Sequence, residues 1–222
     1  MIDWTPFLIT LKLAFITTSI LFVISIPISY WLAYSKVKLK FVFEAMVSLP
    51  LVLPPSVLGF YLLVTFSGES PLGQFLANNF DLSLPFTFAG LVVGSIIYSL
   101  PFMVQPMQAG FQNLPIALKE ASYTLGKSRL QTLIKVLLPN IKASLLTGIV
   151  LSFAHTIGEF GVVLMIGGNL DETRVASIAI YDSVNKLDYS TAHTYSLVLL
   201  LFSFSILAVV YLFNKKGFRA VK

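Results

Sequence analysis

The sequence predicts an all-α protein that crosses a membrane several times as a polytopic bundle of helices. Of its 222 residues, 56% are hydrophobic and only 11% are charged, and the mean hydropathy is +0.85. Soluble globular domains of this size do not have such a composition. Two patterns agree with it: five long apolar stretches, and an uneven distribution of lysine and arginine between them. There is no internal repeat, low-complexity tract or soluble linker, so we expect residues 1–222 to form a single transmembrane domain.

Each of the five apolar stretches is long enough to span a bilayer as a helix, which takes about 20 residues. The first has no basic start and no clear small-residue cleavage site, so we expect a span and not a removed signal. A sixth crossing at residues 174–188 is less favoured because that segment is short and polar. We expect an amphipathic outer helix or a partly re-entrant loop there. The five predicted spans are Phe7 to Tyr34, Phe43 to Phe66, Phe86 to Gln108, Ala143 to Ile166 and Thr194 to Phe213.

The positions of lysine and arginine predict the orientation, because these residues are retained on the cytoplasmic side. With the N-terminus out and the C-terminus in, twelve of the 15 lie in cytoplasmic segments. Only Arg174 and Lys186 lie outside, and Lys12 falls within the first span. The cytoplasmic residues form three groups: Lys36, Lys38 and Lys40; Lys119, Lys127, Arg129, Lys135 and Lys142; and Lys215, Lys216, Arg219 and Lys222.

The second cytoplasmic segment contains EASYTLGKSRLQTLIKVLLP, residues 120–139, in which GKS is the end of a phosphate-binding motif. That motif also needs a first glycine, where this chain has Ala121, and a preceding strand. The residues before Gly126 instead favour a helix that begins at Pro115. Ser128 is a plausible cap for a second helix, which we expect Pro139 to end. We therefore predict two short helices joined at Gly126, and no nucleotide site; from composition alone, such a helix pair could rest on lipid.

The spacing of residues in this segment resembles the EAA loop of importer-type ABC permeases, EAAxxxG followed by nine residues and IxLP. Ser122 stands at the second alanine and Val136 at the isoleucine. The resemblance implies a type I ABC importer permease fold, in which residues 113–140 form a coupling loop that docks on a separate ATPase subunit. ATP and Mg²⁺ would be bound by that partner, and this chain would hold no cofactor and no catalytic residue. The coupling residues it implies are Glu120, Ala121, Ser122, Gly126, Leu138 and Pro139.

Two further stretches resemble the oxyanion branch of these permeases. LPLVLPPSVLGFYLL (residues 49–63) is similar to their second core span, and FAHTIGEFGVVLMIGGN (153–169) with ETRVASIAIY (172–181) to their GEFG or GEYG region. The short chain and GEFG favour the molybdate group; tungstate and sulfate or thiosulfate remain alternatives. The loop GGNLDETR departs from the NIPGxT pattern of the group. The resemblance implies a homodimer in the cell inner membrane, a cytoplasmic ATPase dimer and an extracytoplasmic oxyanion-binding protein.

Polar and helix-breaking residues within the spans are candidates for the pathway or gate. Pro54 and Pro55 should kink the second span and expose carbonyl groups. Glu159 lies inside the fourth span, and His155, one turn earlier, is its expected partner in a brace beside the gate. We expect substrate itself to meet small residues and backbone amides. The candidate pathway residues are Pro54, Pro55, His155, Gly158, Glu159, Gly161, Gly168 and Asn169.

Other classes of protein fit the sequence less well. A transporter driven by an ion gradient would usually show repeated halves and several intramembrane charges, whereas the spans contain only Lys12, His155 and Glu159 as candidates. An enzyme is disfavoured because HExxH, GxSxG and paired carboxylates are absent. The chain has no cysteine, and His155 and His193 lie on different segments, so we predict no metal site. The basic residues are not gathered into an aromatic-flanked patch, so we predict no nucleic-acid binding.

Overall fold

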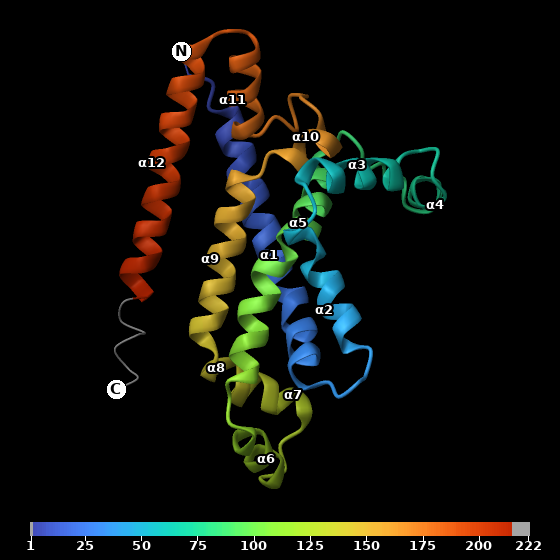
Figure 1. The fold of residues 1–222 in the computed structure, drawn as a ribbon, viewed down its shortest axis with the longest axis vertical. Coiled ribbons are helices and arrows are strands. Elements are labelled where there is room, and N and C mark those ends of the chain that lie inside the picture. Colours follow the sequence, from blue (N-terminus) through green and yellow to red (C-terminus); the bar gives the residue numbers. More distant parts are fainter. Residues whose placement is uncertain (1, 215–222) are drawn as a thin grey trace.

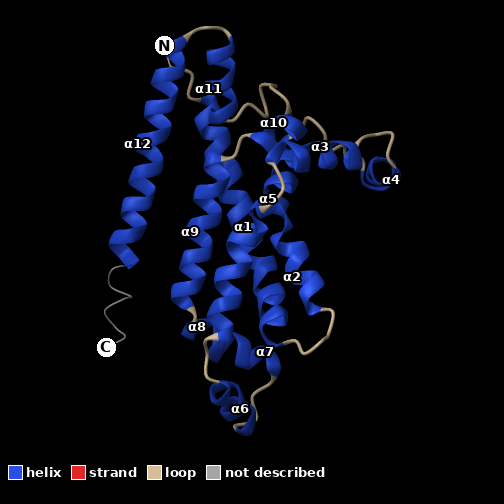
Figure 2. Cartoon of the chain, viewed as in Figure 1, coloured by secondary structure: helices blue, strands red, loops and turns tan. Residues whose placement is uncertain are grey.

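The structure is a computed structural model, and it describes residues 2–214 of the chain. The basic group at Lys215, Lys216, Arg219 and Lys222 lies outside the described residues. The described part contains helices and loops and no strand (Figure 2). In chain order the helices are α1 (Thr5–Tyr34), α2 (Lys40–Ser48), η1 (Leu49–Leu51), α3 (Pro55–Phe66), α4 (Pro71–Phe80), α5 (Phe88–Gln112), α6 (Ile116–Thr124), α7 (Arg129–Thr132), η2 (Leu133–Leu137), α8 (Leu138–Asn140), α9 (Lys142–Gly158), α10 (Gly161–Gly167), α11 (Ala176–Asn185) and α12 (Tyr189–Asn214).

Helices α1, α5 and α9 lie side by side and form the centre of the molecule (Figure 1). Their contacts are lined by small hydroxyl residues, which let helix backbones approach closely in a membrane where no hydrophobic driving force exists between helices. Large apolar residues fill the remaining space, among them Leu21, Met103 and Met107. The fully buried hydroxyl residues of this centre are Thr17, Ser25, Ser29, Ser95, Ser99 and Ser152.

Three of the predicted spans are confirmed as single long apolar helices: α1, α5 and α12. The second is bent by 109° between η1 and α3, at Pro54 and Pro55, as the missing proline amides predict.

The prediction of the fourth span as one continuous helix was wrong. Helix α9 ends at Gly158, Glu159 is extended (φ −69°, ψ 136°), and α10 starts again at Gly161. By length and composition, the described residues contain three helices able to span a membrane, or up to five spans when each of two bent pairs counts as one. These pairs are Lys40–Leu51 with Pro55–Phe66, and Arg129–Asn140 with Lys142–Gly158; the orientation stays a prediction.

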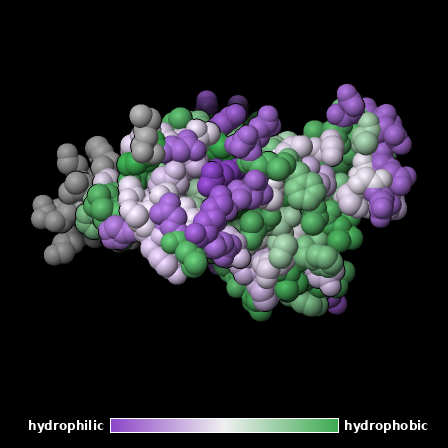
Figure 3. Space-filling model, turned by 90° about the horizontal axis from the view of Figure 1, so that it is seen from above, coloured by the Kyte–Doolittle hydropathy of each residue, from purple (hydrophilic) through white to green (hydrophobic). Residues whose placement is uncertain are grey.

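The end of the molecule that carries α11 also carries the connections to α10 and α12 (Figure 1). Figure 3 looks onto this end and shows hydrophilic residues over it and on the projecting α4. Of the two alternatives expected at residues 174–188, the structure shows a helix: in α11 the apolar Ile178 and Ala179 are buried and the polar Asn185 is exposed. Helix α4 was not predicted, although Ser70 caps it and Pro71 opens it in the manner that favours a helix start.

Candidate functional site

An open cavity of about 560 Å³ lies where the break between α9 and α10 meets α3 and α5. Five of the eight predicted pathway residues line it: Pro55, His155, Gly158, Glu159 and Gly161. Its other lining residues are Ser56, Tyr98, Ala154 and Phe160. The residues from the second and fourth predicted spans thus meet at one place, because both spans are interrupted at the same level of the bundle.

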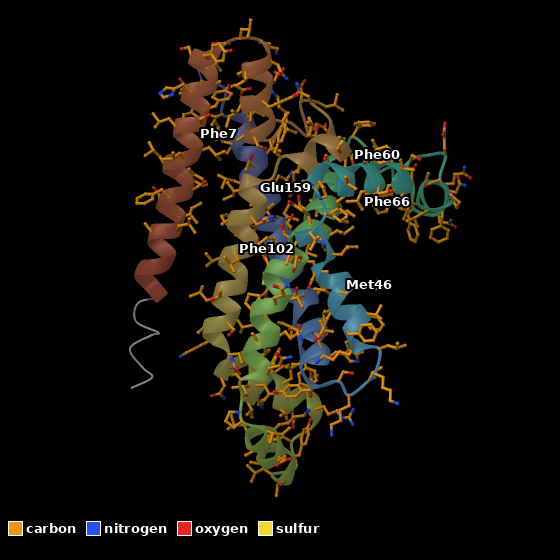
Figure 4. All side chains as sticks on the ribbon, viewed as in Figure 1. Phe7, Met46, Phe60, Phe66, Phe102 and Glu159 are labelled. Atoms are coloured by element: carbon orange, nitrogen blue, oxygen red, sulfur yellow. The ribbon has the colours of Figure 1, made fainter. Side chains whose placement is uncertain are left out.

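Glu159 lies at the break itself, where the backbone leaves the helical conformation. Its side chain is only 4% exposed, and Ser95 of α5 donates a hydrogen bond of 2.8 Å to Oε2. Oε1 has no hydrogen-bond partner among the described residues. Its backbone carbonyl accepts a bond of 2.6 Å from Ser177 of α11. Figure 4 shows Glu159 at the junction of α9 with its neighbours, and the residue connects to α5 through its carboxyl group and to α11 through its backbone carbonyl.

His155 has partners of its own. Its Nδ1 lies 2.9 Å from the hydroxyl of Ser99, which in turn lies 3.0 Å from the hydroxyl of Thr156. The ring stacks on Phe102 with centroids 4.0 Å apart, and Tyr98 lies 4.6 Å away on a tilted plane. These contacts bind α9 to α5 one turn away from the Glu159 carboxyl group.

The expected brace between His155 and Glu159 was wrong in its geometry. The spacing of four residues places two side chains together only within a continuous helix, and the helix ends at Gly158. Each residue instead bonds to a serine of α5, and no ion pair joins them in the described part of the chain. Sequence reasoning missed Ser95 and Ser99, although their spacing of four on one apolar helix was a detectable signal of a polar face.

The predicted glycines differ in what they do. A Cβ added at Gly161 would lie 2.6 Å from Cβ of Pro55, so this glycine permits close contact between α10 and α3. Gly158 has open space around it and is the last residue of α9, so it lies at the break and makes no close helix contact. Gly168, with φ 64°, ends α10 and lies outside the cavity lining, as do Asn169 and Pro54.

The predicted loop at residues 113–140 forms a separate helical projection at the end opposite α11 (Figure 1). Gly126 adopts φ 73° between α6 and α7, and Ser128 caps α7 in a reciprocal bond with Gln131, which confirms both predictions. Ser122 is buried and its hydroxyl lies 2.9 Å from that of Thr132, so the serine that replaces alanine joins the two helices. Pro139 lies in the first turn of α8; the helical run continues to Asn140 before a bend of 78°, so its expected helix-ending role was wrong by one residue.

The coupling candidates separate into exposed and structural residues. Glu120 and Ala121 are exposed on α6, whereas Ser122 is buried against α7. Leu137, just before Leu138, is fully buried with Phe111 and Ile141 and fastens the projection to the end of α5. Glu120 therefore presents its side chain at the outer surface of a locally fixed helical unit.

The described residues form a helical bundle in which two interrupted spans meet at a cavity lined by His155 and Glu159, with a helical projection at one end; this architecture is that of a membrane protein with a broken-helix site inside the bundle. A family model described as "Binding-protein-dependent transport system inner membrane component" matches residues 25–218. The chain belongs to this family, and it is a multi-pass membrane protein. Membership favours the ATP-driven class over a transporter driven by an ion gradient.

Individual relatives and solved structures agree with this assignment. The chain is 46% identical to the "Molybdenum transport system permease protein ModB" of Azotobacter vinelandii, over 98% of this chain and 96% of the relative. It is 34% identical to the "Sulfate transport system permease protein CysT" of Salmonella typhimurium, over 86% and 69%. In fold it is similar to the MetNI methionine ABC transporter in inward-facing form (TM-score 0.70, 19% identity, 98% and 94% covered). It is also similar to a bacterial ABC transporter for the import of alginate (TM-score 0.74, 17% identity, 98% and 80% covered).

Proposed function

We propose that this chain is the membrane-spanning subunit of an ATP-driven importer for molybdate. The observation that carries the proposal is the 46% identity, over nearly the full length of both chains, to a permease of a molybdenum transport system. The family description supports delivery of the substrate by a separate binding protein. The hydrolysis of ATP takes place on a partner subunit, and this chain supplies the path through the membrane.

The cavity at the break between α9 and α10 supports a role in that path. Irregular backbone is tolerated inside a membrane only against protein or a water-filled space, and two broken helices meet here at Pro55 and Glu159. In a homodimer with the path on the twofold axis, two such breaks form a gate. Bonds from Ser95 and Ser177 hold one side of the break, so a tilt of α5 or α11 moves Glu159 with it.

The projection of α6 to α8 supports the coupling role. It presents Glu120 beside apolar side chains that have no cover in this chain, including Ile116, Leu125 and Leu130, each more than 60% exposed. A helix that lays exposed apolar side chains into a groove is a common mode of recognition between proteins. Closure of the ATPase pair moves this unit, and the unit moves the ends of α5 and α9 to which it is joined.

Sulfate is the second candidate substrate, favoured by 34% identity to a sulfate permease. The two anions have the same tetrahedral shape and charge, and we assign most of the discrimination between them to the binding protein. The lower identity places this alternative second.

The test is ATPase activity after the chain is reconstituted with its ATPase subunit and binding protein, with molybdate, tungstate and sulfate compared. We expect molybdate to stimulate hydrolysis and Glu120→Ala to abolish that stimulation. Glu69→Ala removes the same charge from an exposed loop at the other end of the molecule and is the matched control. Stimulation by sulfate alone would move the assignment to the sulfate group, and transport without an ATPase partner would overturn the proposal.

A further inference from the structure

A second cavity, of about 340 Å³, lies between the end of α1 and the helices α6 and α7. It carries two cations, Lys119 and Arg129, and no acidic residue. The remaining lining consists of aromatic and hydroxyl side chains: Tyr30, Trp31, Tyr34, Ser35 and Tyr123. The pathway and the coupling contact described above use none of these seven residues.

Lys119 is positioned by two aromatic rings and not by an acid. Its Nζ lies 4.1 Å from the ring centre of Tyr34 and 5.4 Å from that of Tyr30. Tyr34 is itself fixed, since its hydroxyl donates a bond of 3.0 Å to the carbonyl of Phe111. The ion pairs of the described residues involve neither Lys119 nor Arg129. Two positive charges therefore converge on a cavity in which the described chain supplies no counter-charge.

The cavity and the proposed ATPase contact occupy different faces of α6. Lys119 and Tyr123, four residues apart, face the end of α1. Ile116 and Glu120, also four residues apart, form an adjoining face that is exposed. A ligand in the cavity would lie behind the coupling surface and would hold α6 against α1.

An apolar groove adjoins the cavity at Trp31 and lies beside the membrane-spanning part of α1. It has a volume of about 570 Å³ and is lined by residues of α1 and α2 and by Leu100 of α5. Trp31 lines both the groove and the cavity, and packs edge-on against Phe43 at 5.0 Å. Besides these two, the groove is lined by Pro27, Ile28, Leu32, Met46, Val47 and Leu100. A basic cavity at the end of a span thus adjoins an apolar groove directed into the span.

We propose that this paired site binds an anionic phospholipid, with its phosphate in the cavity of Lys119 and Arg129 and an acyl chain in the groove beside Met46. In the predicted orientation this end of the molecule is cytoplasmic, and basic cavities on that side of a membrane recognise such headgroups. Amphipathic aromatic rings such as Trp31 and Tyr34 favour the level of the headgroups. A free phosphate ion would use the two cations but would leave the groove without a function. The bound lipid fastens the coupling helix to α1.

The test counts lipids retained by the purified full-length permease, by native mass spectrometry, after exchange into phosphatidylglycerol or phosphatidylcholine. We expect selective retention of phosphatidylglycerol, weakened about fivefold per charge removed in Lys119→Gln and Arg129→Gln. Lys135→Gln removes an exposed charge of the same loop outside the cavity and should retain the lipid. Met46→Trp, at a side chain 63% exposed, fills the groove and should reduce retention while both cations remain.

Three results would overturn the inference. Equal retention of phosphatidylglycerol and phosphatidylcholine by the wild-type chain would show that the site does not recognise an anionic headgroup. If inorganic phosphate displaces the retained phosphatidylglycerol, and binds the lipid-free chain through the same two cations, the cavity is a site for a free anion. Loss of the dimer in Met46→Trp with unchanged lipid retention would assign the groove to a second copy of the chain. The count needs neither ATPase nor substrate, so its outcome is independent of the proposed transport function.

Discussion

The polar cluster around Glu159 and the helical projection around Ser122 are built from contacts of very different range. Glu159 is bonded to Ser95, 64 positions earlier, and to Ser177, 18 positions later. Ser122 is bonded to Thr132, ten positions later, and the turn between them is closed by Gly126 and the cap at Ser128. The cluster therefore changes when helices move relative to one another, whereas the projection can move as one unit. This difference suits the first to a gate and the second to a coupling element.

The largest effect should come from the close contact between α10 and α3 beside the cluster. Gly161→Ala places a Cβ 2.6 Å from Pro55, and such overpacking costs about 1–3 kcal/mol of stability. We expect a lower unfolding temperature in detergent and a loss of substrate-stimulated ATPase activity. Gly158→Ala is the control, since its new Cβ meets no atom within 4 Å. Equal losses in both variants would show that the contact with Pro55 has no special weight.

A smaller effect should follow when Glu159 loses its bond to Ser95. Glu159→Gln keeps an oxygen that can accept this bond, whereas Glu159→Leu leaves the buried Ser95 hydroxyl without it, at a cost on the order of 1 kcal/mol. We expect the leucine variant to unfold at a lower temperature than the glutamine variant. If Glu159→Gln retains transport and Glu159→Leu loses it, transport depends on the hydrogen bond to Ser95. Loss in both would assign it to the charge.

The sequence predicts the projection well because its signals are local. A serine cap, a glycine in a left-handed turn and an apolar spacing of three and four residues act within about ten positions. The bend at Pro54 and Pro55 follows for the same reason, because proline lacks an amide donor wherever it lies.

The cluster is predicted only in part. The sequence singles out Glu159 and His155 as costly intramembrane groups, but their partners Ser95 and Ser99 come from α5, and no local pattern fixes which face of α5 meets α9. The end of α9 at Gly158 is also a tertiary result, since the apolar pattern continues through Val162 and Val163. A prediction that extends the helical spacing across this break places His155 beside Glu159, although the two side chains do not meet.

Within the projection, the bond between Ser122 and Thr132 should have a modest and separable effect. Ser122→Ala restores the alanine of the EAA pattern and removes a neutral bond worth about 0.5–1 kcal/mol. Thr132→Val should cost a similar amount. In the double variant the two losses should not add, because either change alone removes the same contact. Additive unfolding free energies would show that the two hydroxyls act independently and that the unit is held by Gly126 and its cap alone.

The smallest effect concerns α11, which carries Ser177 and so supports the cluster from outside. The hydrogen bond from Lys186 (2.8 Å), followed by the charges of Lys186 and Arg174, lowers the pKa of the Asp182 carboxyl group and outweighs the opposing effect of burial. Because the folded pKa lies below the unfolded value of about 3.9, the stabilisation is complete above that value and is lost as the pH falls through the folded pKa.

Lys186 is 69% exposed, so we expect the ion pair to contribute only a few tenths of a kcal/mol to the free energy of unfolding. The unfolding temperature of the wild-type chain should therefore fall more steeply below about pH 4 than that of Asp182→Asn, with Lys186→Gln between them. Parallel curves for the three proteins would show that this ion pair contributes nothing to the support of the cluster.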